Sequence, residues 1–306
     1  MDRRTFFRKS FGASIIVGAG LAGKYENLFA STYNSADIPF DLVAVKGGEP
    51  EVMLQKGIAA LGGIRAFVKK GQKVVIKPNI GWDVGPERAG NTNPKLITEI
   101  VRQCCSAGAK EVYVLDHTCD NWQRCYKNSG IESAVKEAGG KIAPAHTESY
   151  YHEVSLPNGK NLVKAKEHEL ILGADVFINI PVLKSHDSAR LTIAMKNLMG
   201  NVWDREDWHR NDLHQCIADF ATFRKPTLNI VDAYNVMMRN GPRGVSVEDV
   251  RSMKSLLIST DIVAIDTAAT KLFGINPSDV RYIQLAADQK VGRMDLENLR
   301  IKRMTV

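Results

Sequence analysis

Charged and polar side chains follow five apolar segments of this sequence, each at the point where a buried strand would end. The five groups are Lys77-Pro78-Asn79, Asp116-His117-Thr118, Lys184-Ser185-His186, Asp232 with Asn240-Gly241-Pro242-Arg243-Gly244 after it, and Ser259-Thr260-Asp261. In open parallel sheets, ligands bind beyond the carboxyl ends of the strands. If these segments form such a sheet, the five groups gather along one edge and build a binding site.

Residues 184–197 hold the densest of these groups. Ammonium, imidazole and hydroxyl groups together could bind an anion, hold a metal ion or transfer protons. If a helix covers residues 189–198, Thr192 and Lys196 lie one turn apart on one face, with His186 in the loop before it. Charged residues at the start of a solvated helix would look the same, but we favour a functional interpretation.

Two of the lysines stand next to prolines. Pro78 follows Lys77 directly, and Pro181 lies three residues before Lys184. Proline stiffens the backbone, and a rigidly held cation suits the recognition of a carboxylate or a phosphate. The alternative is a solvated lysine at the exit of each strand.

These considerations assign roles to eleven residues, most of them at the predicted strand ends. The expected catalytic residues are His186, His117, Lys184 and Asp116. The expected substrate-binding residues are Lys77, Asn79, Lys196, Asn197, Asn240 and Arg243. The expected ligands of a divalent metal are Asp116, His117, His186 and Asp232, since ligands often converge from separate loops. His209 and His214 are five residues apart, so an ideal helix does not place them together as a zinc-binding pair.

Five cysteines occur in the chain, at positions 104, 105, 119, 125 and 216. None of their spacings is C-x-x-C, so an iron–sulphur cluster or a structural zinc site is poorly supported. An odd number in a chain of this size is not a disulfide framework. Cys119 and Cys125 flank a loop and could form one disulfide.

The order of apolar and amphipathic segments predicts an α/β fold, with a mainly parallel sheet covered by helices on both faces. We expect strands at residues 41–46, 73–76, 111–115, 176–180, 228–231, 256–259 and 299–306. We expect helices at residues 50–61, 93–106, 129–138, 189–198, 207–223, 262–273 and 277–287. Residues 151–165 alternate around Pro157-Asn158-Gly159 and predict a small inserted β-hairpin. Two lobes with a boundary near residues 145–170 are an alternative to a single domain over residues 38–306.

The amino-terminal 30 residues have the pattern of an export signal. Arg3 and Arg4 stand in a basic head, and residues 11–21 are modestly apolar. Paired arginines before a short apolar segment indicate the twin-arginine route, with its translocase as a partner and the periplasm as the destination. The apolar segment is too short and too rich in glycine for a stable membrane span. The alternative is an arginine-rich amino terminus on a cytosolic protein.

Composition and charge exclude several classes of protein. The 306 residues are 44% hydrophobic and 25% charged, which is typical of a soluble globular protein and not of a disordered chain or a coiled coil. Residues 1–30 hold five basic and two acidic side chains, so the formal charge of +7 falls to +4 without them. Since no dense basic stripe or known nucleic-acid module is present, we expect no nucleic-acid partner.

Several segments resemble the domain of unknown function 362 family, in order along the chain from about residue 43 to beyond residue 272. The matching segments are residues 75–79, 179–186, 192–200, 231–233, 240–244 and 259–266. The family has no settled activity, and its members are often described as iron–sulphur proteins where a ferredoxin-like cysteine cluster is attached. This chain has no such cluster. In addition, Asp116-His117-Thr118 is similar to the Asp-His-Thr-Arg element of nickel-pincer lactate racemases, although Cys119 replaces the arginine.

The leading hypothesis is an exported enzyme that acts on a small anionic substrate, with a divalent metal as an optional aid to acid–base chemistry. Lysines would neutralise the anion, and His117 or His186 would serve as general acid or base. A non-catalytic periplasmic binding or assembly protein is the main alternative. Redox chemistry through Cys119 and Cys125 is a weaker one.

Overall fold

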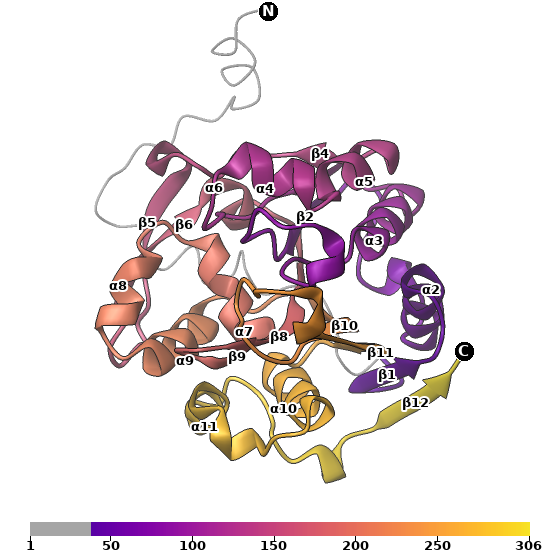
Figure 1. Ribbon diagram of the computed structural model, residues 1–306. Helices are drawn as coiled ribbons and strands as arrows, with labels where there is room; N and C mark the ends of the chain where they lie inside the picture. The colour runs from indigo at the N-terminus through magenta and orange to yellow at the C-terminus, as the bar shows by residue number, and fades with distance from the viewer. Residues whose placement is uncertain (1–37) are drawn as a thin grey trace, which may run out of the picture. The chain divides into compact units, whose positions relative to one another are not determined.

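The computed structural model describes residues 38–306, which contain a mixed β-sheet of ten strands (Figure 1). Eight of the strands follow the order β12-β1-β11-β10-β7-β2-β3-β4, while β8 pairs with β10 and β9 pairs with β8. The strands are β1 (Leu42–Lys46), β2 (Lys73–Pro78), β3 (Glu111–Val114), β4 (Lys141–Ile142), β7 (Val176–Ile180), β8 (Val182–His186), β9 (Arg190–Thr192), β10 (Leu228–Met237), β11 (Val250–Ser259) and β12 (Ile301–Thr305).

One half of the sheet is parallel, as the apolar segments predict. Strands β10, β7, β2, β3 and β4 pair in parallel, with Lys77 opposite Asn179 where β2 and β7 end. All five residues of β7 are buried, because a strand covered on both faces needs apolar side chains in both directions. The predicted α/β class is therefore confirmed, and the carboxyl ends of β2, β3 and β7 meet at one edge.

Helices cover both faces of this sheet. Leu257 of β11 belongs to the main core cluster on one face, which α9 and α10 share. The next residue, Ile258, points the other way and lies against Gly57 of α2, as the alternation of side chains along a strand requires. The longer helices are α2 (Pro50–Ala60), α3 (Pro94–Ser106), α9 (Leu213–Phe223), α10 (Ile262–Phe273) and α11 (Arg281–Asp288). Figure 1 shows α2 beside β1 and β11, and α10 next to α11.

Local signals set the ends of two predicted helices. Asn93 caps α3 by accepting a hydrogen bond from the Lys95 amide, and Pro94 occupies the first helical position. Asp261 caps α10 in the same way, through the amides of Val263 and Ala264. α10 has the predicted bounds, and α3 begins one residue after the predicted start.

The structure differs from the sequence prediction around two helices. The helix expected at 129–138 is α5 (Ile131–Glu137), and a helix that was not predicted, α4 (Trp122–Asn128), precedes it, with Gly130 at φ +74° between the two. The helix expected at 207–223 corresponds to α8 (Arg205–Arg210) and α9, with Asp212 in the left-handed region between them. A residue with positive φ cannot continue an α-helix, so each element ends there.

The prediction of a helix over residues 189–198 is wrong. β8 and β9 form a tight antiparallel pair with Lys184 opposite Thr192, and only α7 (Ala194–Asn197) is helical. A short 3₁₀ turn, Leu198–Asn201, follows. Thr192 and Lys196 therefore lie on different elements rather than one turn apart on a helix.

The inserted hairpin is present as β5 (Tyr151–Ser155) and β6 (Lys164–His168), which form a separate two-stranded sheet. Residues 38–306 belong to one compact unit. Glu167 of β6 also makes a bridge with Val202. The hairpin is thus an insertion in that unit and not a border between two lobes near residues 145–170.

The export signal expected in residues 1–30 lies outside the described residues. Within residues 38–306, no helix combines the length and apolar character that crossing a membrane requires.

Candidate functional site

A small cavity lies where β2 and β3 end and where β8 and α7 pass. Its volume is about 70 Å³, well below the roughly 300–1,000 Å³ of typical drug-sized ligand sites. Eight of the residues singled out in the sequence line it: Lys77, Asn79, Asp116, His117, Lys184, His186, Lys196 and Asn197. The remaining lining residues are Gly81, Trp82, Thr192, Met199, Gly200, Arg205, His209 and Pro242. The cavity has room for a small ligand or for one end of a longer one.

Lys77 is completely buried at the end of β2 and paired with Asp116. Its Nζ lies 2.8 Å from Asp116 Oδ1 and donates hydrogen bonds of 2.8 Å to Asn197 Oδ1 and to the carbonyl oxygen of Pro78. Burial lowers the pKa of Lys77, and the Asp116 carboxylate partly opposes that shift. The other Asp116 oxygen accepts a 2.6 Å hydrogen bond from the Ile80 amide, so both oxygens of this carboxylate have partners.

Lys184 is equally buried but has no carboxylate within ion-pair distance among residues 38–306. Its Nζ donates to Asn79 Oδ1 at 2.9 Å and to the Gly90 carbonyl oxygen at 2.5 Å. Burial lowers the pKa of Lys184 to about 7. The lysine is therefore held by neutral acceptors and retains an uncompensated charge when protonated.

A chain of buried amides fixes these lysines in place. Asn197 Oδ1 accepts from Asn79 Nδ2 at 3.0 Å, and Asn197 Nδ2 donates to Asn179 Oδ1 at 2.8 Å. Asn179 Nδ2 in turn lies 3.0 Å from Asn229 Oδ1. The chain of amides links the ends of β2 and β7 and the beginning of β10 to α7.

Lys196 enters the cavity from α7, whose first turn is held by a distant carboxylate. Asp266 of α10 accepts hydrogen bonds from the amides of Ala194 at 2.8 Å and Met195 at 3.0 Å. Lys196 is half-buried and makes no hydrogen bond or ion pair with residues 38–306. Burial lowers its pKa to about 8. Asp266 thus acts on the cavity from a distance, since its hydrogen bonds to α7 position Lys196 and Asn197.

Gly200 brings the backbone of the following turn against the Lys77–Asp116 pair. A Cβ at this position would lie 1.8 Å from Asp116 Oδ1 and 2.6 Å from Lys77 Nζ. Since Cβ atoms essentially never approach other heavy atoms that closely, only glycine fits here.

His117 has a defined tautomer when it is neutral. Its Nδ1 lies 2.9 Å from the carbonyl oxygen of Val202, which can only accept, so Nδ1 carries the proton and Nε2 is an acceptor. The ring stacks on Trp203 at 4.9 Å between centroids and 4° between planes. Burial, followed by the charge of Arg205, lowers the pKa of His117.

His186 has the opposite tautomer. Its Nδ1 accepts a 3.3 Å hydrogen bond from the Ala189 amide, so Nε2 carries the proton of the neutral ring. Burial and the charges of Lys196 and Lys184 lower the pKa of His186 to about 2. Two of the three imidazoles that line the cavity are thus neutral and have opposite tautomers, with Nε2 of His117 as an acceptor and Nε2 of His186 as a donor.

Arg205 and His209 of α8 are lining residues that the sequence did not single out for this site. The guanidinium of Arg205 donates to the carbonyl oxygens of His117 and Thr118. Arg205 and His209 stand four residues apart, which puts them on one helix face. The spacing of four residues could have predicted that these two side chains lie together. It does not indicate that Arg205 contacts the loop at residues 117–118.

Comparison with known proteins places the chain in a family. Residues 74–271 match the model of the family described as Domain of unknown function (DUF362). The chain belongs to this family. Over 240 residues this DUF362 protein is 27% identical to the thylakoid-associated protein sll1697 of Synechocystis sp., and the match covers 76% of this chain and 72% of that one.

Solved structures similar to the DUF362 protein are more distant. The lactate racemase apoprotein of Thermoanaerobacterium thermosaccharolyticum has a TM-score of 0.44 and 12% identity, with 70% of this chain and 53% of that chain covered. A protein from Thermotoga maritima has a TM-score of 0.45 and 11% identity, with 79% and 60% covered. The DUF362 protein thus spans less than two thirds of either solved chain.

Three residues expected at the site lie outside the cavity lining of the DUF362 protein. Asp232 is within β10, which is longer than predicted, and its oxygens accept from the amides of Asn93 at 2.7 Å and Tyr234 at 3.1 Å. Asn240 donates to Asp249 at 2.7 Å, and Arg243 lies 3.6 Å from Asp120. The fifth predicted strand end, residues 259–261, is at the opposite edge of the sheet because β11 runs antiparallel to β10.

The expected metal-ligand set is also not assembled. Over residues 38–306, no group of three or more histidine, cysteine, aspartate or glutamate side chains could hold a metal ion. Asp116 is engaged by Lys77 and Ile80, and Asp232 is outside the cavity. The donor set of the DUF362 protein therefore does not fit a divalent ion at this place. All five cysteines are free, so Cys119 and Cys125 do not pair.

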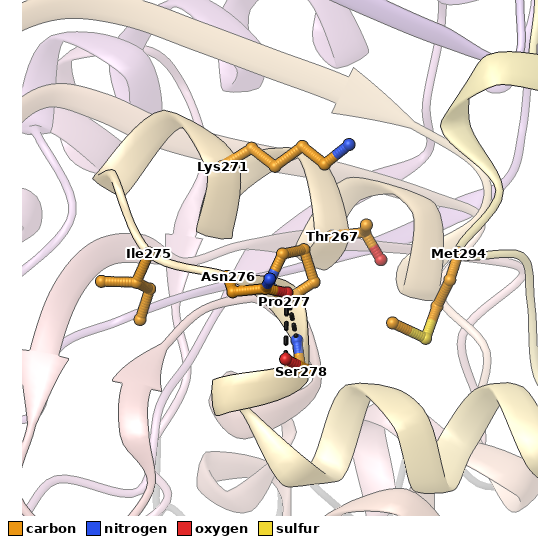
Figure 2. A pocket seen from close by; sticks show the side chains of 7 residues that line it. All are labelled: Thr267, Lys271, Ile275, Asn276, Pro277, Ser278 and Met294. Carbon is orange, nitrogen blue, oxygen red and sulfur yellow. Dashed lines mark hydrogen bonds between the residues drawn. The ribbon is translucent and has the colours of Figure 1, made fainter.

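A second cavity of the DUF362 protein is larger but has only one charged residue in its lining. It is an open groove of about 570 Å³ lined by Thr267, Lys271, Ile275, Asn276, Pro277, Ser278 and Met294 (Figure 2). Asn276 Oδ1 accepts two hydrogen bonds of 3.0 Å from Ser278, one from its amide and one from its hydroxyl group. Lys271 is the single charged lining residue and is exposed. The convergent charged groups are in the smaller cavity.

Proposed function

We propose that this protein binds a small anionic ligand in the cavity and catalyses proton transfer on it. The observation that carries the proposal is the excess of cations: three lysines and Arg205 line the cavity with one carboxylate, Asp116. Burying several like charges costs free energy, which a bound anion recovers through short-range attraction. The small volume favours a ligand with one compact anionic group.

The two histidines supply the acid–base chemistry. His117 Nε2 can accept a proton, and His186 Nε2–H can donate one, because their Nδ1 atoms make opposite hydrogen bonds. General acid–base catalysis needs such a pair within reach of one substrate. Rigidly held ammonium groups nearby would stabilise negative charge as it develops on the ligand.

Calorimetric titration tests the binding step. Propionate and inorganic phosphate are the probes, at pH 7. We expect at least one to bind, with affinity at least tenfold lower in Lys184→Met and unchanged in Lys271→Met, whose lysine is exposed in the open groove. Binding that is equal in the two variants would contradict the proposal.

Deuterium exchange tests the chemical step. The protein is incubated in D₂O with short carboxylic acids, and NMR follows label entering the carbon next to the carboxylate. We expect the protein to catalyse this exchange, and we expect His117→Gln and His186→Gln each to lower the exchange rate at least tenfold. Binding without exchange for every acid would instead favour a non-catalytic ligand-binding protein, which the same cationic cavity also supports.

We further propose that the protein is exported by the twin-arginine route. The support is the basic head with Arg3 and Arg4 before an apolar segment. The test replaces both arginines with lysine and follows the protein by cell fractionation. We expect the processed periplasmic form to disappear, whereas unchanged fractionation would overturn this part of the proposal.

A further inference from the structure

The three lysines of the cavity differ in how they are held. Lys77 has three acceptors within 2.8 Å, one of them a carboxylate. Lys184 has two acceptors, at 2.9 and 2.5 Å. Lys196 lines the same cavity without a hydrogen-bond or ion-pair partner among residues 38–306. Two amines are thus fixed in place, and one is left for a ligand.

This division separates the chemical roles of the lysines. An amino group that donates to two or three fixed acceptors is held in one position, so it suits charge neutralisation. An amino group without such acceptors can turn toward a ligand and, when it is neutral, present its lone pair for bonding, as in the lysines that form Schiff bases. Lys196 also stands on an anchored element, because Asp266 holds the amides of the first turn of α7.

We propose that Lys196 is a nucleophile that forms a Schiff base with the carbonyl group of a small anionic ligand, an oxo acid, whose carboxylate is neutralised by Lys184 and Arg205. This inference rests on the proposed binding of an anion in the same cavity. It narrows the ligand class to acids that carry an aldehyde or ketone next to the carboxylate.

The covalent step balances without an oxidant or a reductant. The Nζ lone pair of neutral Lys196 attacks the carbonyl carbon, and a C–N bond forms as the C–O π bond opens. The two Nζ protons pass to the carbonyl oxygen, which leaves as water while the C=N bond forms. His186 Nε2–H and His117 Nε2 line the same cavity and can relay these protons.

The surroundings favour the neutral amine. Burial lowers the pKa of Lys196 to about 8, and the charges of Arg205 and Lys77 act in the same direction. A usable fraction of Lys196 is therefore unprotonated near neutral pH, unlike an ordinary lysine with a pKa of about 10.4.

Reductive trapping tests the inference. The full chain is mixed with glyoxylate or pyruvate and sodium borohydride at pH 8, and peptide mapping by mass spectrometry locates the adduct. We expect trapping at Lys196 at least tenfold faster than at exposed lysines. The Lys196→Arg variant should carry no adduct at position 196. The control variant, Lys271→Arg, should carry the adduct at Lys196 to the same extent as the original chain. Thermal melting confirms that each variant is folded.

The outcomes separate this inference from the function on which it rests. Adduct at Lys184, or equal labelling of cavity and exposed lysines, overturns the role of Lys196. Propionate has no carbonyl, so its binding by calorimetry reports anion binding alone. If propionate binds and no adduct forms at Lys196, the Schiff base is wrong and anion binding stands. If propionate and phosphate both fail to bind, the proposed function falls as well.

Discussion

Lys77 Nζ and Asp116 Oδ1 lie 2.8 Å apart, and both side chains are almost completely buried. The pair joins the end of β2 to the loop after β3. Removing one partner of a buried ion pair leaves an unpaired charge, which typically costs about 3–5 kcal/mol.

We therefore expect Asp116→Ala to lower the free energy of unfolding by about 3–5 kcal/mol, measured by urea denaturation. The matched control is Glu153→Ala, which removes an exposed pair with Lys164 and should change stability by about 1 kcal/mol or less. Equal effects of the two substitutions would show that the Lys77–Asp116 pair is not desolvated.

Gly200→Ala should damage both stability and anion binding. The added methyl group would lie 1.8 Å from Asp116 Oδ1, so the turn or the ion pair must move. Thermal melting and calorimetry measure the two effects. For stability, Gly81→Ala is the control because its nearest atoms would lie 3.8 and 3.9 Å away. A Gly200→Ala protein as stable as Gly81→Ala would contradict the close approach.

Anion affinity should depend on pH through Lys184 and Lys196, whose pKa values are about 7 and about 8. The lysines attract an anion only when protonated, so affinity should be highest below pH 7 and fall as the pH rises through both values. Above each pKa, the affinity should fall by up to about tenfold per pH unit. Calorimetry in two buffers of different ionisation enthalpy should detect proton uptake on binding near pH 8. A flat affinity between pH 6 and pH 9 would rule out these lysines as the charge source.

Asp266 should matter to the cavity and not only to stability. Asp266→Ala frees the amides of Ala194 and Met195, so we expect a loss of about 1–3 kcal/mol in stability and at least tenfold weaker anion binding. Asp261→Ala is the matched control, since Asp261 caps α10 through two amides and does not line the cavity. It should lower stability and leave anion affinity unchanged. Equal losses of affinity in the two variants would assign Asp266 a purely structural role.

Local patterns determined the elements that carry the candidate site. The buried segments around Val75 and Ile178 are apolar in both side-chain directions, which a parallel sheet between helices requires. Strand ends in such a sheet meet at one edge, so Lys77 and the Asp116–His117 pair were expected together. Caps such as Asn93 and Asp261 act within three residues, and for that reason the sequence predicted the bounds of α3 and α10.

Contacts between distant residues decided the rest. Thr192 ends a strand because β9 pairs with β8, and α7 begins at Ala194 because Asp266, 72 residues later, accepts its amide. Asp232 lies outside the cavity, where its carboxyl group accepts a hydrogen bond from the amide of Asn93, 139 residues earlier. A sequence shows which side chains could do chemistry, but which of them keep a free group depends on long-range hydrogen bonds. Only the tertiary structure therefore separates the fixed Lys77 and Lys184 from Lys196, which has no hydrogen-bond or ion-pair partner among residues 38–306.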